Sequence, residues 1–202
     1  MEAQLYTESD LAQRLEMSRT PIREALKRLR AEQLVVLRPH GGVFVPPATP
    51  QMLDEVYTIR ALLESRATGA AASKISPQEL TRLREVCVLV EHNHVARRRE
   101  RLGELYREFH DIILTACRMP ILAALMSQVE SHIERFRNAS IVLPGVNSRA
   151  EHEEIIAALE RGDEKAAEKM AYQHVMHLKT AHIDDMKKVT SKASGRQRVS
   201  RS

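Results

Sequence analysis

Long apolar stretches and cysteines are scarce in this chain, and each scarcity argues against a class of protein. No run of eighteen apolar residues occurs among the 202 residues, so the sequence predicts no membrane-spanning helix. The amino terminus carries neither a basic patch nor an apolar segment, which argues against a signal peptide. The two cysteines, Cys87 and Cys117, lie in helical patterns and suit buried thiols better than a disulfide framework. We therefore expect a cytoplasmic protein.

Positive charge is also modest, and its distribution says more than its total. A net charge of +4 is weak support for nucleic-acid binding. Between residues 18 and 32, however, there are five Lys or Arg against two Glu, and residues 187–202 hold six bases and no acid. We interpret 187–202 as a basic disordered tail, with non-specific attraction to DNA as the alternative.

Residues 18–26 read Ser-Arg-Thr-Pro-Ile-Arg-Glu-Ala-Leu and have the features of a helix start. Ser18 and Thr20 are both able to act as the N-cap, and Pro21 suits the first helical position. Arg19 and Arg23 then lie one turn apart on a single face, where they can enter a major groove. The stretch is therefore a candidate DNA-recognition helix.

A shorter helical segment, residues 11–15, precedes this stretch and is separated from it by a three-residue connection. Helix, tight turn and helix form the helix-turn-helix layout. Two apolar runs follow, residues 34–37 and 43–45, with Arg-Pro-His-Gly-Gly between them, which is the composition of a hairpin with a glycine turn. Such a wing places backbone amides and a basic tip on the phosphates beside the groove.

The proline-rich residues 46–50 predict a stiff, extended connection and divide the chain into domains 1–47 and 48–186. Beyond Pro50 no strand-like alternation occurs, so the fold class is mainly α, with a winged helix-turn-helix followed by an all-α bundle. Ser76 and Ser148 open two capping boxes, and Gly162 suits a helix stop. About six helices are expected, at 50–73, from 77, 96–117, 120–138, 148–160 and from 163.

The string Ser18-Arg19-Thr20-Pro21-x-Arg23-Glu24-Ala25-Leu26 resembles the GntR family of bacterial transcription regulators, in its FadR-like subgroup with a helical FCD ligand-binding domain. The resemblance implies that Arg19, Thr20 and Arg23 contact operator bases or phosphates and that the wing approaches the minor groove. The expected DNA-binding residues are Ser18, Arg19, Thr20, Pro21, Arg23, His40, Gly41 and Gly42.

Two departures from the family pattern bear on this domain. Gln33 stands where the family usually has glycine, and the family has a further helix before the stretch equivalent to Leu5. A chain that starts at Met1 has no room for that helix, so the winged domain is expected to lack its first helix and part of its core.

Three histidines, His110, His152 and His174, each fall on the apolar stripe of a predicted helix and should point inward. His152 and His174 lie at similar distances, roughly 15 Å, from the turn between the last two helices, hence level across the pair. Imidazoles that face each other at one height are able to bind a metal ion together. The alternative is that the three histidines are core residues, each satisfied by a hydrogen bond. The resemblance adds that the family binds a divalent metal through three histidines and an Asp or Asn, at whose position this chain has Tyr106.

The predicted metal ligands are His110, His152 and His174, for Zn²⁺, Ni²⁺ or Mn²⁺. The predicted effector-binding residues are Arg60, Tyr106 and His177. Arg60 is able either to clamp an effector carboxylate or to pair with Glu64 at i+4. We expect a homodimeric repressor on operator DNA, controlled by a small carboxylate effector. The alternatives are a histidine-site metalloenzyme and a regulator whose helical domain only dimerises.

Overall fold

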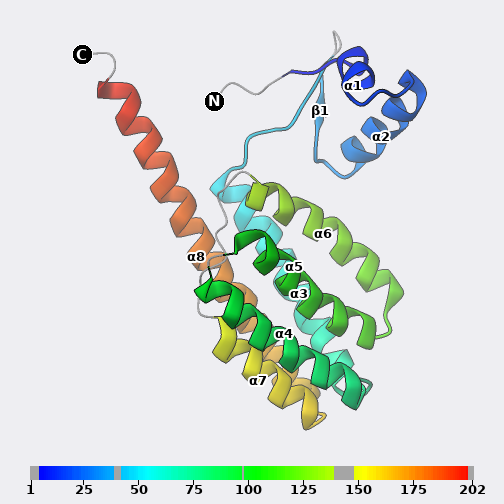
Figure 1. Cartoon of the computed structure of the whole chain (residues 1–202), viewed down its shortest axis with the longest axis vertical. Helices are drawn as coiled ribbons and strands as arrows, with labels where there is room; N and C mark the ends of the chain where they lie inside the picture. The colour runs from blue at the N-terminus through cyan, green and yellow to red at the C-terminus, as the bar shows by residue number, and fades with distance from the viewer. Residues whose placement is uncertain (1–4, 39–41, 97, 139–147, 200–202) are drawn as a thin grey trace. The chain divides into compact units, whose positions relative to one another are not determined.

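The computed structural model describes residues 5–38, 42–96, 98–138 and 148–199. The chain divides into two compact units, residues 1–49 and 50–202, and this division falls two residues beyond the predicted boundary at residue 47. Figure 1 traces the elements of both units by residue number. None of the described helices is long and apolar enough to cross a membrane.

The first unit contains helices α1 (Glu8–Arg14) and α2 (Arg19–Ala31) and strands β1 (Val36–Leu37) and β2 (Val43–Phe44). A capping box starts α1: the Thr7 N–H donates to the Asp10 carboxylate at 2.8 Å, and Thr7 Oγ1 accepts from the Asp10 N–H at 3.1 Å. One small core holds the unit together, and its buried members are Ala12, Ile22, Leu26, Val35 and Val43.

Helix α2 begins at the first of the two N-cap candidates, Ser18, and not at Thr20. Its N-cap is Ser18, whose side chain makes no capping hydrogen bond, and Arg19 is the first helical residue. Pro21 is therefore the third helical residue, so its predicted place at the first position is wrong. Proline is tolerated there because the first four N–H groups of a helix have no partner within the helix.

The wing is a small antiparallel sheet in which Val36 pairs with Phe44 and Leu37 with Val43. Tyr6 pairs with the other side of Val43 through hydrogen bonds of 2.9 and 2.7 Å, so the strand sits between two neighbours. The strands are shorter than the apolar runs: Val35 packs into the small core and lies outside the ladder.

Gln33 adopts a left-handed backbone conformation, with φ of +58°. This is the position where the family usually has glycine, and glycine is the residue that takes such a conformation without steric cost. Gln33 ends the turn after α2, and its N–H donates to the carbonyl of Arg30 at 3.0 Å. The departure from the pattern therefore leaves the turn in place at the cost of a strained residue.

The second unit is an all-helical bundle, as predicted. Ser76 and Glu79 form the expected capping box, with the Ser76 N–H donating to the Glu79 carboxylate at 2.7 Å. Gly162 ends a helix with φ of +65°. Among the described residues the helices are α3 (Pro50–Ala72), α4 (Pro77–Val95), α5 (Arg99–Ala116), α6 (Pro120–Asn138), α7 (Ser148–Glu160) and α8 (Glu164–Val199).

Close packing of α3 against α8 depends on a glycine. A Cβ atom on Gly69 would lie 3.1 Å from the carbonyl oxygen of Glu164, so a larger residue would push the two helices apart. Cys87 and Cys117 are free and buried within the main core, as predicted, and burial raises the pKa of the Cys87 thiol to about 11.

Helix α8 continues to Val199, whereas we predicted a disordered tail from Lys187. Residues 187–199 contain no proline. Extending a helix that is already formed adds one hydrogen bond per residue and avoids the cost of nucleation. The same composition that looked disordered in isolation can therefore continue a helix that starts in the bundle.

Candidate functional site

The predicted DNA-contacting residues gather at the start of α2 and face solvent. Ser18, Arg19, Thr20, Pro21 and Arg23 are all exposed. Ile22 and Leu26 are buried in the small core and fix the opposite face of the helix. Gly42 lies in the wing turn with φ of +112°, and His40 and Gly41 fall outside the described residues. The first turn of α2 contains no acid, so its exposed end is suited to phosphate groups.

Arg23 is held in place by α1. Its Nε and Nη2 atoms both donate to Glu8 Oε2, each at 3.2 Å. Both side chains are about half exposed, so the pair contributes little to stability. Its effect is to orient the guanidinium on the exposed face of α2.

The three predicted metal ligands converge in the bundle. One ring nitrogen of each of His110, His152 and His174 lies within 4.8 Å of the others, and all three residues are buried. They come from α5, α7 and α8. His152 Nε2 and His174 Nε2 are 3.3 Å apart, which brings two donor atoms to a common point. We call these three residues the histidine cluster.

Burial keeps two members of the cluster in the neutral form that binds metal. It lowers the pKa of His152 well below 6.5, and the neighbouring His174 and His110 add to this effect. Burial also lowers the pKa of His174, although a hydrogen bond to Glu151 acts in the opposite direction. Phe109 stacks on His152 with ring centroids 4.0 Å apart and fixes the plane of that imidazole.

Two glutamates contact the cluster, and neither was predicted from the sequence to have a role in it. Glu151 Oε2 is 2.7 Å from His174 Nδ1, and Glu64 Oε1 is 3.0 Å from His110 Nδ1. The second contact lacks hydrogen-bond geometry, so His110 Nδ1 lies close to Glu64 but has no hydrogen-bond partner among the described residues. A buried imidazole nitrogen without a partner, beside two other imidazoles, fits a site that takes a cation.

Arg60 forms the ion pair that we gave as the alternative to an effector clamp. Its Nε donates to Glu64 Oε2 at 2.8 Å, and the two side chains are only 2% and 4% exposed. Burial alone would raise the pKa of the Glu64 carboxyl, but the Arg60 guanidinium outweighs it and holds the pKa well below its usual range. Both groups are therefore charged and committed to each other.

A cleft of about 630 Å³ opens beside the cluster, between α5 and α6. Arg60 and His110 line it, so the structure brings these two predicted residues together. Tyr106 and His177 are not among its lining residues. The Tyr106 ring meets the His152 ring edge-on, with ring centroids 6.1 Å apart, and His177 binds Glu151. The other lining residues are Arg107, Asp111, Leu114, Thr115, Ala123, Met126, Ser127, Glu130, Ser131 and Glu134.

Comparisons with known proteins show the family to which both units belong. Residues 55–177 match the FCD domain family, and residues 1–45 match the family described as bacterial regulatory proteins, gntR family. The chain belongs to the FCD branch of the GntR family. The resemblance seen in the sequence is thereby confirmed.

Among relatives of this GntR-family chain, the HTH-type transcriptional regulator McbR of Escherichia coli K12 is 33% identical over 127 residues, which are 63% of this chain and 57% of McbR. The solved structure of E. coli McbR/YncC superimposes with a TM-score of 0.74 at 25% identity, covering 90% of this chain and 88% of that one. The metal-free FCD domain of TM0439 shares the fold, with a TM-score of 0.59 at 18% identity, covering 71% of this chain and 99% of that one.

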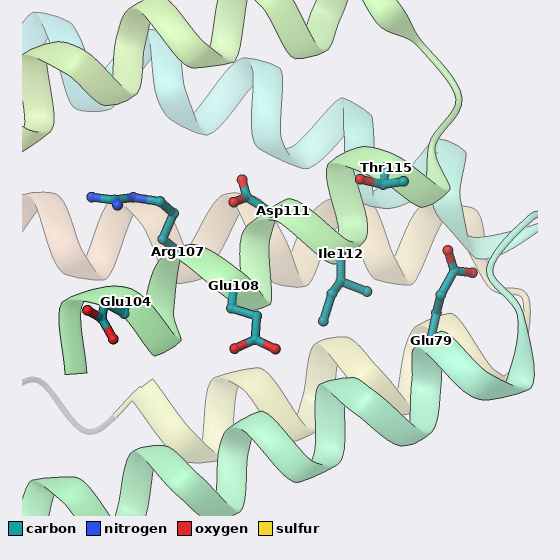
Figure 2. A pocket seen from close by; sticks show the side chains of 7 residues that line it. All are labelled: Glu79, Glu104, Arg107, Glu108, Asp111, Ile112 and Thr115. Atoms are coloured by element: carbon teal, nitrogen blue, oxygen red, sulfur yellow. The ribbon is translucent and has the colours of Figure 1, made fainter. Parts of the chain in front are cut away.

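The families and relatives that match are transcriptional regulators and not enzymes, which agrees with our ranking of the metalloenzyme as an alternative. A second pocket in this GntR-family chain is lined by residues of two neighbouring helices. It measures about 380 Å³ and lies between α4 and α5, where Figure 2 shows Glu108 and Ile112 pointing from α5 toward α4. Two of its acids are already engaged: Glu79 caps α4, and Glu108 binds Arg82 at 2.6 Å.

Proposed function

We propose that this chain is a sequence-specific DNA-binding transcription regulator, acting as a homodimeric repressor. The observation that carries the proposal is the exposed start of α2, where Arg19, Thr20 and Arg23 stand on one side of a helix anchored by Ile22 and Leu26. A helix presented in this way enters the major groove, while the wing turn at Gly42 supplies backbone contacts to phosphates.

We further propose that the histidine cluster holds a divalent ion, with Zn²⁺, Ni²⁺ and Mn²⁺ as the candidates. Three imidazole ligands would leave coordination positions open, because Tyr106 offers no carboxylate where the family has one. The ion would supply a Lewis-acid anchor for a ligand oxygen. His110 lines the cleft, so a ligand in the cleft can reach an ion held by the cluster.

The effector that best suits these open positions is a small carboxylate. Its carboxylate would bind the ion and not Arg60, since Arg60 is already paired with Glu64 in the interior. Binding would change repression by favouring one dimer geometry, in which the spacing of the two recognition helices does or does not match the operator half-sites.

DNA binding is tested by selecting sequences from a random duplex library with the purified chain and measuring affinity for the selected site. Arg23→Ala should abolish specific binding, because it removes a guanidinium from the centre of the exposed face. Arg30→Ala, which removes a base in the last turn of the same helix, is the matched control and should change affinity far less. Equal loss in both variants would refute recognition by the start of α2.

Metal binding is tested by elemental analysis and titration of untagged protein. His152→Ala and His174→Ala should each remove the ion, while His92→Ala, which alters an exposed histidine of α4, should retain it. DNA affinity of metal-free His152→Ala should not respond to carboxylates that shift the wild-type protein. A wild-type chain that binds no ion in stoichiometric amount would refute the metal proposal and leave the DNA proposal standing.

A further inference from the structure

Glu151 is the carboxylate most directly engaged with the histidine cluster, yet it lies outside the set of ligand atoms. Its Oε2 accepts from His174 Nδ1 at 2.7 Å, and its Oε1 accepts from His177 Nδ1 at 2.5 Å. The three side chains are 23%, 1% and 64% exposed, in the order Glu151, His174, His177. The carboxylate therefore links a buried imidazole to one at the surface.

We propose that Glu151 is a positioning residue for the metal ion. An ionised carboxylate can only accept hydrogen bonds, so His174 must carry its proton on Nδ1. The lone pair is then on Nε2, the nitrogen that faces His152 Nε2 at 3.3 Å. Glu151 thus fixes both the tautomer and the ring orientation that coordination needs, and it makes the imidazole a stronger donor. This inference rests on the proposed metal site.

The arrangement follows from two neighbouring residues at the start of α7. His152 points inward and supplies a ring nitrogen to the cluster, while the preceding residue, Glu151, reaches across to α8. His174 and His177 are three residues apart on α8 and so lie on one face of that helix. Glu151 spans them with its two oxygen atoms, and consecutive residues of α7 provide one ligand and the support for another.

His177 holds the carboxylate in this position. With Oε1 bound to His177, Glu151 cannot turn toward solvent without losing a hydrogen bond at each oxygen. Both oxygens are committed to Nδ1 atoms, which is why Glu151 acts through His174 and not as a ligand. From the sequence we predicted that His177 binds the effector. In the structure it is the outer member of a chain of hydrogen bonds that runs from His174 through Glu151 to His177.

Glu64 has the corresponding place beside His110, but it is not equivalent. It is bound to Arg60, and its 3.0 Å approach to His110 Nδ1 lacks hydrogen-bond geometry. Glu151 binds the two histidines, and among the described residues it pairs with no Lys or Arg. The orienting effect on the cluster should therefore depend more on Glu151.

The experiment measures the dissociation constant of Zn²⁺ and of Ni²⁺ by competition with a chromophoric chelator, on full-length variants whose helicity is checked by circular dichroism. Glu151→Ala should weaken metal binding about 10- to 100-fold. Glu151→Gln, whose amide oxygen still accepts from Nδ1, should recover part of the loss. His177→Ala, at an exposed position that touches no ligand atom, should cause a smaller loss, and Glu154→Ala on the same helix should cause none.

Cobalt substitution adds a readout that a structural role would not move. The visible d–d absorption of bound Co²⁺ should change in Glu151→Ala and be unchanged in Glu154→Ala. If Glu151→Ala binds metal as tightly as Glu154→Ala while His152→Ala binds none, the inference about Glu151 is overturned and the metal site stands. If neither the wild-type chain nor His152→Ala binds an ion, the proposed metal site and the positioning role of Glu151 are both refuted.

Discussion

Replacing Arg60 with methionine would separate the two roles that the sequence allowed for this residue. The Arg60–Glu64 pair is almost fully buried, with its Nε and Oε2 atoms 2.8 Å apart. Removing one partner of such a pair leaves a buried charge uncompensated and costs about 3–5 kcal/mol. For a unit of this size 1 kcal/mol corresponds to about 2–4 °C, so the melting temperature of Arg60→Met should fall by about 6–20 °C.

Thermal and urea unfolding of metal-free protein, followed by circular dichroism, measure this loss. Arg66→Met on the same helix is the matched control, because its contact with Glu168 is exposed and 3.9 Å long, and it should cost less than about 1 kcal/mol. The double variant Arg60→Met/Glu64→Leu replaces the pair with apolar side chains and should recover most of the stability.

The pH dependence of Arg60→Met has a definite sign. In the wild type the pKa of Glu64 is lower in the folded protein than in the unfolded chain. Ionised Glu64 therefore contributes to stability above about pH 4.5, and this contribution is lost as the pH falls through the pKa of the folded protein. Without Arg60, burial raises the pKa of Glu64 instead. The loss of unfolding free energy in Arg60→Met should therefore become smaller as the pH falls and Glu64 takes up a proton. A cost no larger than that of Arg66→Met would mean that Arg60 is free to clamp an effector, and would refute the structural role.

Three further predictions concern single turns and caps. Gln33→Gly should stabilise the winged unit by about 0.5–1 kcal/mol in urea unfolding, because glycine removes the strain of a φ of +58°, whereas Gln33→Ala should bring no gain. Gly42→Ala should cost about 1 kcal/mol or more, since φ is +112° and the new Cβ would lie 2.9 Å from Leu5 Cγ; an unchanged urea midpoint would contradict this. Glu79→Ala should lower the free energy of unfolding of the bundle at pH 7, because hydrogen bonds from Ser76 stabilise the ionised Glu79 carboxylate and hold its pKa low. The difference in unfolding free energy between wild type and variant should become smaller below about pH 4.5, and a difference that does not change with pH would rule out the charged cap.

Helix positions could be predicted because their signals are local. Pro50, the capping box at Ser76 and the glycine stop at Gly162 each act through neighbouring backbone groups, and each marks a helix end in the structure. The end of α8 could not be predicted in this way. It depends on extending a helix that the bundle already stabilises, and composition alone does not contain that information.

The convergence of His110, His152 and His174 could also be predicted, from the apolar stripe on each helix. What could not be predicted is how carboxylates are shared among competing partners. Glu151 and His174 are 23 residues apart, and nothing local links them. The pairing of Glu64 with Arg60 was already one of the alternatives from their i+4 spacing, but the approach of Glu64 to His110 depends on how α3 packs against α5.

The order of the three histidines along the chain would give a bound ion a mechanical role. His152 and His174 belong to one helical hairpin closed by the turn at Gly162, while His110 lies on α5. An ion bound by all three would act as a cross-link that fastens this hairpin to the rest of the bundle. Removing the ion would then release the link between α5 and this hairpin, while the packing of α8 against α3 and of α7 against α4 would remain. Metal supply would in this way change how firmly α5 is held to the C-terminal hairpin.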